Sequence, residues 1–231
     1  MNDPGMTAPL RGPVARYVAD INDAGSLAAR FRQRGFDLFR RLLNDLPRPI
    51  TILDVGGTPA FWETMSGTDQ AEVRITLVNV LTQIATRPWM TSLVADATQL
   101  SGIGDRQYDV VFSHSLIEHV GDFPQQQRVA AEICRVGRRY FVQTPNFWFP
   151  IEPHFLCPGF HWLPLGVRAW LVSHFRLGWI ERIPDRVTAR RAVAGIRLLR
   201  PAELRALFPG ATLYEVRLLG LAQSLIVYGG W

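Results

Sequence analysis

The stretch TILDVGGTPAFWE, residues 51–63, decides the fold. Residues 52–55 predict a buried strand, Gly56 and Gly57 predict a sharp turn, and residues 60–63 predict the start of a helix. Such a unit can cradle a nucleotide-like ligand, because glycine lets the backbone approach closely and a helix N-terminus offers free N–H groups. The spaced glycines of a dinucleotide-binding loop are missing, so this pattern alone is weak support for a cofactor site.

Strands and helices alternate along most of the chain. This order predicts a mostly parallel α/β sheet with helices on both faces, and it places the strand C-termini at one edge, where ligands bind. In the third strand, Leu93, Val94 and Ala95 are expected to be buried. The expected strands are residues 50–55, 73–80, 90–97, 108–115 and 138–146, and the expected helices are 26–46, a short one from 60, 123–137 and 201–208.

The end of the chain departs from this alternation. Residues 208–220 and 222–230 predict two strands with a short connection, and strands joined so tightly must be antiparallel. Residues 147–180 are rich in aromatic residues and proline, and they follow the fifth strand, so we expect them to overhang the ligand edge. We expect a loose segment at 1–25 and a single domain at 26–231 that contains this insert.

The charged residues narrow the classes of function. The net charge is +5, and all 25 basic residues are arginine. The absence of lysine excludes a P-loop, a Schiff-base lysine and a lysine general base. The arginines are scattered, which is typical of a solvated surface rather than of a nucleic-acid interface. We see no apolar run long enough to span a membrane and no pattern of a secretory signal, so we expect a cytoplasmic protein.

Three polar residues stand where predicted strands end. Asp54 would be costly to bury without a partner, and an ammonium group of a ligand would serve as one. Asn79 stands where an acidic residue commonly binds a ribose, so it is either a ribose ligand or a strand-ending turn residue. Asp96 either accepts a hydrogen bond from an adenine amino group or caps the next turn.

These features occur together in class I S-adenosylmethionine-dependent methyltransferases, which the chain resembles. The resemblance implies a doubly wound, Rossmann-like sheet of seven strands and S-adenosylmethionine as the cofactor. Thr58-Pro59-Ala60 stands in place of the family's later glycines, and Asn79 stands in place of its usual acid. The motifs that carry the resemblance are ILDVGG (52–57), LVNV (77–80), VADATQL (94–100), YDVVFSHSLIEHV (108–120), YFVQTPN (140–146) and the terminal hairpin.

The resemblance also implies roles for individual residues. The cofactor-binding residues that it implies are Asp54, Gly56, Gly57 and Thr58 at the methionine end, Asn79 at the ribose, Asp96 and Ala97 at the adenine, and Ser113 and His114 on the fourth strand.

Methyl transfer needs an aligned acceptor and sometimes a base for its proton. Glu118 and His119 follow the fourth strand and are either such a base or a helix-start pair that packs and caps. His154 and His161 lie in the aromatic insert, which is either a lid over an apolar acceptor or a small satellite core. Some related methyltransferases bind a metal at an acid-x-x-Glu-His motif; Ser115 stands in the place of its first acid, so we expect no metal.

We therefore expect O- or N-methylation of a small acceptor that is apolar, aromatic or glycolipid-like. Peripheral membrane contact through residues 147–180 is a variant of this hypothesis. Two alternatives stay open: a catalytically silent domain that binds a partner, and an RNA methyltransferase. A nicotinamide reductase is disfavoured by the terminal antiparallel pair, because the sheets of dinucleotide dehydrogenases continue parallel.

Overall fold

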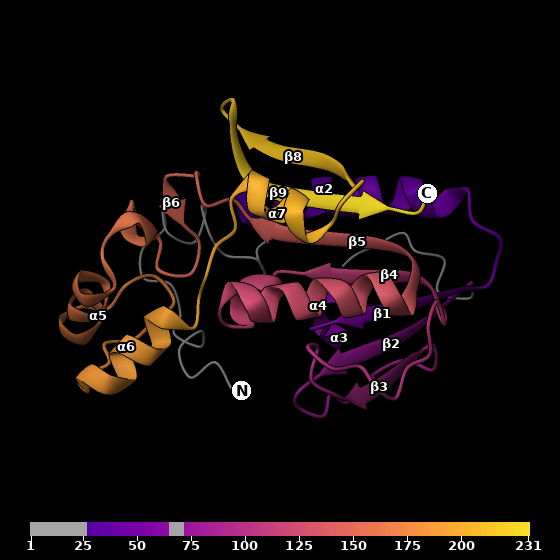
Figure 1. Ribbon diagram of the computed structural model, residues 1–231, viewed down its shortest axis with the longest axis horizontal. Coiled ribbons are helices and arrows are strands. Elements are labelled where there is room, and N and C mark those ends of the chain that lie inside the picture. Colours follow the sequence, from indigo (N-terminus) through magenta and orange to yellow (C-terminus); the bar gives the residue numbers. More distant parts are fainter. Residues whose placement is uncertain (1–26, 65–71) are drawn as a thin grey trace.

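A seven-stranded sheet forms the centre of the molecule, in the order β3-β2-β1-β4-β5-β9-β8 (Figure 1). The computed structural model describes residues 27–64 and 72–231, so the expectation for residues 1–25 lies outside the described residues. Strands β1 to β5 are parallel, and β9 is antiparallel to both β5 and β8, which confirms the predicted fold class. The strands are β1 (Ile50–Val55), β2 (Val73–Asn79), β3 (Met90–Val94), β4 (Tyr108–His114), β5 (Gly137–Pro145), β8 (Thr212–Leu218) and β9 (Leu221–Gly229).

Helices cover both faces of this sheet. The helices α2 (Leu27–Asn44) and α3 (Pro59–Thr64) pack on one face, and α4 (Phe123–Val136) and α7 (Pro201–Leu207) pack on the other, nearer to the viewer in Figure 1. Each face has its own apolar core, as expected for a sheet between two helical layers. Within the described ranges, the structure has no helix that is long and apolar enough to cross a bilayer.

The third strand corrects one prediction. Leu93 and Val94 are 37% and 54% exposed, and Ala95 is half-buried, whereas all three were expected to be buried. The reason is the position of β3 at the edge of the sheet. The connection from β2, residues 80–89, is fully described and forms no helix, so this edge lacks the helical cover that the other parallel strands have.

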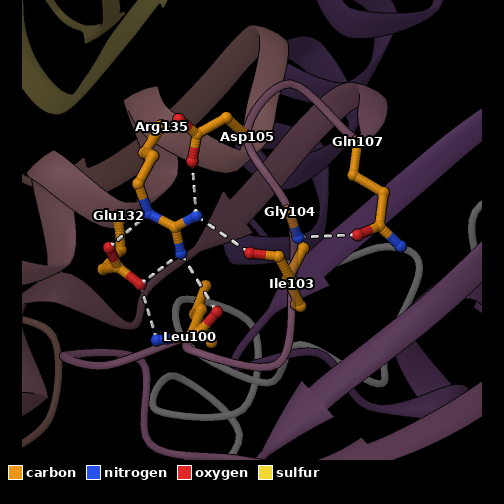
Figure 2. A network of polar contacts seen from close by, with 7 residues as sticks. All are labelled: Leu100, Ile103, Gly104, Asp105, Gln107, Glu132 and Arg135. Carbon is orange, nitrogen blue, oxygen red and sulfur yellow. Dashed lines mark hydrogen bonds and ion pairs between the residues drawn. The ribbon is translucent and has the colours of Figure 1, made fainter.

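Arg135, in the last turn of α4, fixes the loop between β3 and β4 (Figure 2). Its guanidinium donates to the carbonyls of Leu100 and Ile103 at 3.0 and 2.8 Å, and to the carboxylates of Glu132 and Asp105. Glu132 also accepts from the Leu100 N–H at 2.6 Å. Because the planar guanidinium offers five N–H donors in one fork, a single side chain can serve all these acceptors.

The segment after β5 forms a small lobe with its own core, which we call the insert lobe (residues 147–196). Figure 1 shows it beside the end of the sheet from which β5 leaves. Its apolar core includes Phe155, Phe160 and Val172, and α6, which the sequence pattern left unassigned, adds Ala189 and Val193. The elements of the lobe are β6 (Ile151–Glu152), β7 (Cys157–Pro158), the 3-10 turn η2 (Phe160–Trp162), α5 (Leu165–His174) and α6 (Arg186–Ala194).

Candidate functional site

The glycine turn after β1 uses its two glycines for different reasons. Gly56 has a φ of +86°, a left-handed conformation that favours glycine, and a Cβ there would lie 2.9 Å from Leu116. A Cβ at Gly57 would lie 2.1 Å from Oδ2 of Asp54, so the carboxylate occupies the space that a side chain would need. The turn is therefore held tightly between Asp54 on one side and the segment that follows β4 on the other.

Asp54 is buried at the end of β1, as the sequence predicts, but it has a protein partner that the sequence did not reveal. The indole N–H of Trp62, in α3, donates to its Oδ2 at 2.7 Å. Burial raises the pKa of Asp54 to about 7, although the bond from Trp62 opposes the rise. A cation close to this carboxylate would favour its ionised form.

Asn79 lies beside the same turn. Its side-chain amide donates to the Gly57 carbonyl at 3.4 Å, and its oxygen accepts from the Leu81 N–H at 3.4 Å. Both contacts are long, so they hold the side chain weakly. Asn79 thus makes the contacts expected of a turn residue at the end of a strand. It also lies at the edge of the sheet where a ribose-binding residue would have to lie.

The residues after β3 lie at the same edge of the sheet. Oδ1 of Asp96 accepts from the Thr98 N–H and hydroxyl at 2.8 and 2.7 Å, and these bonds hold the pKa of Asp96 below its ordinary value. Asp96 therefore caps its own turn, one of the two roles open at the sequence level. Ala97 is half-buried against the core, and Thr58, in the glycine turn, is exposed.

Near the end of β4, the side chain of Ser113 makes a hydrogen bond within the protein. Its hydroxyl is buried and donates to the Val55 carbonyl at 3.0 Å, which ties β4 to the start of the glycine turn. His114 packs against the ring of Phe61, with centroids 5.2 Å apart. Burial, and then the nearby Arg32, lower the pKa of His114 to about 3, so its imidazole is neutral near pH 7.

Arg32 comes from α2 and was not singled out in the sequence. Its guanidinium lies 5.9 Å from the centre of the Phe61 ring, and burial lowers its pKa. The arginine-rich pattern of α2 gave no sign of which arginine would reach the site, because that depends on how the helix packs across the sheet. The contact brings a cation to the side of His114.

A second group of polar residues gathers where the insert lobe meets the segment after β4. His119 is in η1 (Ile117–His119), whose first turn includes a bond from the His119 N–H to the Leu116 carbonyl. Nε2 of His154, between β6 and β7, lies 3.1 Å from Nε2 of His119, and the two rings are perpendicular. Glu118 completes the group, since ligand atoms of all three residues lie within 4.8 Å of one another.

Glu152, which the sequence reading passed over, orients His154. Its Oε1 lies 2.6 Å from Nδ1 of His154, and its Oε2 accepts the backbone N–H groups of His154 and Phe155, both at 2.7 Å. Burial raises the pKa of Glu152, but the His154 ring and these N–H donors outweigh it, so the pKa lies below its ordinary value. An ionised Glu152 places a proton on Nδ1 of His154. The acid two residues before a histidine, in PIEPH, was the available signal.

Glu118 is held less completely. It is fully buried, and the Thr144 hydroxyl of β5 donates to its Oε2 at 2.9 Å. Its Oε1 is buried and has no hydrogen-bond partner among the residues that the structure describes. We call Glu118, His119, Glu152 and His154 the histidine cluster.

His161 is placed apart from this cluster. Its Nε2 lies 2.6 Å from the Phe147 carbonyl, to which the Trp162 indole also donates at 3.1 Å. Burial lowers the pKa of His161. Of the four candidate catalytic residues from the sequence, the structure thus brings together Glu118, His119 and His154, while His161 braces the first residues of the insert lobe.

Comparison with known proteins shows which protein family the central part of the chain resembles. Residues 57–140 match the family described as methyltransferase domain. This match, which covers about a third of the chain, and the sheet with its antiparallel β9 and β8 are features of class I S-adenosylmethionine-dependent methyltransferase domains. S-adenosylmethionine is the cofactor of this class, whose members are enzymes.

Two curated proteins of Mycobacterium tuberculosis, MT1557 and Rv1509, are each 34% identical to this chain over 82 residues. That match covers 35% of this chain and 26% of theirs, so it spans about a quarter of the length of these relatives.

Solved structures share the fold at low identity. The CurJ carbon methyltransferase has a TM-score of 0.56 at 11% identity, covering 93% of this chain and 56% of that one. The magnesium protoporphyrin IX methyltransferase of Synechocystis PCC 6803, solved with bound SAH, has a TM-score of 0.53 at 13% identity, covering 86% and 83%. A Rhodobacter sphaeroides protein assigned as a Zn-dependent alcohol dehydrogenase has a TM-score of 0.55 at 11% identity, covering 86% and 97%. These likenesses show the fold alone.

Proposed function

We propose that this protein transfers the methyl group of S-adenosylmethionine to the oxygen or nitrogen of a small acceptor bound beneath the insert lobe. The observation that carries the proposal is the contact between His119 and His154. It joins the lobe to the segment after β4, one short turn from Leu116, which packs against the glycine turn. A cofactor at the turn and an acceptor at the histidine cluster would therefore be neighbours.

The part of the proposal that concerns the cofactor rests on the C-terminal ends of β1, β2, β3 and β4. Asp54 would face the ammonium group of S-adenosylmethionine, with Gly56, Gly57 and Thr58 around its methionine end. Asn79 would bind the ribose, since an amide can donate to one hydroxyl and accept from another. Asp96 and Ala97 would frame the adenine, and Ser113 and His114 would line the site from β4.

The histidine cluster would supply the base that removes the acceptor's proton. In the transfer, an acceptor oxygen or nitrogen forms a bond to the methyl carbon as the carbon–sulfur bond breaks, which leaves S-adenosylhomocysteine. The acceptor must lose a proton, and a positioned imidazole can take it. His119 would take this proton, with His154 and Glu152 behind it to fix its orientation and stabilise the imidazolium. Glu118 and His161 would position these groups.

The proposal is tested first without knowledge of the acceptor. Metabolites of cells with and without the gene are compared by mass spectrometry, and the proposal predicts a pair that differs by one CH₂ group. Calorimetry with S-adenosylmethionine separates the alternatives. A catalytically silent domain would give no methylated product, and an RNA methyltransferase would place the added methyl group in the RNA fraction.

Exposed aromatic residues of the insert lobe favour an amphiphilic acceptor, such as a glycolipid, reached from a membrane surface. Trp162, Trp170 and Phe175 are each about half exposed, and the last two are packed together. The neighbouring α6 exposes Arg186 and Arg190. Aromatic side chains beside arginines suit an interface with anionic lipid.

Vesicle binding tests this part of the proposal. The double variant Trp170→Ala/Phe175→Ala should lose binding to vesicles that contain anionic phospholipid. The matched control is Leu219→Ala, because Leu219 is 95% exposed in the β8–β9 turn, which belongs to the sheet and not to the lobe. If the wild type ignores such vesicles, the acceptor reaches the protein from solution and the membrane contact is rejected.

A further inference from the structure

The histidine cluster combines ligands that divalent transition metals prefer. Two imidazole nitrogens and one carboxylate are a recurrent three-residue set for zinc, which leaves a fourth position open for water or substrate. The Nε2 atoms of His119 and His154 are 3.1 Å apart. Ligand atoms at the corners of a tetrahedral zinc site, with bonds of about 2.0–2.1 Å, are roughly 3.3 Å apart.

A hydrogen bond between the two imidazoles explains only part of this geometry. One Nε2 can donate a proton to the other, and that would account for their short separation. It leaves Oε1 of Glu118 buried without a partner among the described residues. A buried oxygen without a hydrogen-bond partner is costly, and more so when the group is charged, so its retention calls for a ligand.

The surroundings match those of a metal site. His154 presents Nε2 while its Nδ1 faces the Glu152 carboxylate at 2.6 Å, the arrangement that fixes the tautomer of a metal-bound histidine. The Thr144 hydroxyl holds Oε2 of Glu118, so Oε1 is the atom left to bind a cation. The Glu152 carboxylate already faces His154 and two backbone N–H groups, whereas among the described residues the Glu118 carboxylate accepts a hydrogen bond from Thr144 alone.

We propose that Glu118, His119 and His154 bind one divalent transition-metal ion of the zinc class, with Glu152 as the residue that orients His154. This revises the sequence-based expectation of no metal, which considered Ser115 in the local motif and could not foresee a ligand from the insert lobe. The ion would stand beside the acceptor site and bind the acceptor's oxygen or nitrogen, which would lower the pKa of that group so that its proton passes to water. With the ion bound, His119 would be a ligand and would not take this proton. The ion's role at the acceptor rests on the proposed function, but the metal binding itself does not.

Zinc binding is measured directly on the full chain, without cofactor or acceptor. Chelator-treated protein is titrated with Zn²⁺ against a competing chelator, and with Co²⁺ by absorption spectroscopy. We expect one ion per chain. Glu118→Gln, His119→Ala and His154→Ala should each lower the zinc affinity by more than about 100-fold, and Glu152→Gln by about 10–100-fold, as expected for an orienting residue.

His174→Ala is the matched control, because this histidine is exposed on α5 and contacts Ser173 and Trp170 instead of the cluster. It should bind zinc like the wild type. Equal affinity in the wild type and all three ligand variants would overturn the proposal, as would a wild type that binds no zinc at micromolar concentrations.

Chemical modification provides a readout that needs no variant. Diethyl pyrocarbonate modifies accessible imidazoles, and mass spectrometry locates the modified residues. Zinc should protect His119 and leave His174 reactive. Equal modification of His119 with and without zinc contradicts the site even if every ligand variant fails to fold. A protein that binds zinc but methylates nothing would refute the proposed function and leave the metal site intact.

Discussion

Two polar networks in this protein are built differently. The Arg135 network, on α4 and the loop before β4, pairs one guanidinium with two carboxylates and two carbonyls (Figure 2). The histidine cluster joins two segments 35 residues apart and leaves Oε1 of Glu118 without a partner among the described residues. Networks that hold a fold tend to satisfy their own groups, whereas a carboxylate oxygen left unsatisfied in a buried cluster of ligand-type side chains is a candidate site for a ligand.

The largest expected effect comes from breaking the histidine cluster. His154→Ala removes the ring that faces both His119 and Glu152. We expect methylated product, measured by mass spectrometry in cells that express equal amounts of protein, to fall by about 10²–10⁴-fold, the range for loss of a positioned acid or base. His174→Ala should keep the wild-type yield. A wild-type yield from His154→Ala would remove the cluster from the reaction.

The pH dependence of cofactor binding tests the role of Asp54 beside the glycine turn. The free protein holds the pKa of Asp54 at about 7 because the carboxyl is buried. A cationic cofactor binds the ionised form, so its affinity should rise with pH through this value and level off above it. About one tenth of Asp54 is ionised at pH 6 and about nine tenths at pH 8, which gives a roughly tenfold gain.

Calorimetry with S-adenosylmethionine at several pH values measures this gain. Asp54→Asn should bind weakly at every pH, with no rise in affinity near neutrality. A wild type whose affinity stays constant from about pH 6 to about pH 8 would show that Asp54 does not face the cofactor's ammonium group.

Asn79 should have a smaller effect. A neutral hydrogen bond contributes about 0.5–1.5 kcal/mol, so Asn79→Ala is expected to weaken S-adenosylmethionine binding by up to roughly tenfold. Asn79→Asp should bind as well as the wild type or better, because it restores the acid usual at this position. If Asp at this position abolishes binding in calorimetry, Asn79 serves the turn through Gly57 and Leu81 and does not face the ribose.

The smallest expected effect on function comes from disrupting the Arg135 network, whose role we take to be structural. Arg135→Met removes the donors that hold Leu100, Ile103 and Asp105 and should lower the melting temperature. The affinity for S-adenosylmethionine, measured below that temperature, should stay close to the wild-type value. A variant that melts like the wild type but loses the cofactor would contradict the structural role that we give the Arg135 network.

Much of the fold could be predicted because its signals are local. The strand β1 and the antiparallel terminal pair follow from apolar runs and short connections. The exposure of Leu93 and Val94 could not be predicted, since it depends on which strand lies at the edge and on a connection without a helix.

The candidate site also has one part that the sequence predicts and one part that it does not. Asp54, Gly56 and Gly57 stand in one short stretch, so their proximity is a local property. The contact of His119 with His154 depends on how the insert lobe packs against the segment after β4, and no spacing in the sequence encodes that. Trp62, the partner of Asp54, was missed for a related reason, because an indole in a helix carries no motif of its own. Glu152 was missed although its place two residues before His154 offered a signal.

The most direct test of the central claim, that cofactor and acceptor chemistry occupy two adjoining parts of one edge, is calorimetry with S-adenosylmethionine on the wild type and His154→Ala side by side. The account predicts one cofactor bound per chain, with the same dissociation constant in both proteins. Folded wild-type protein that gives no binding heat would contradict the assignment of the glycine turn. Binding that is lost in His154→Ala would place the cofactor at the histidine cluster and contradict the division between the two parts.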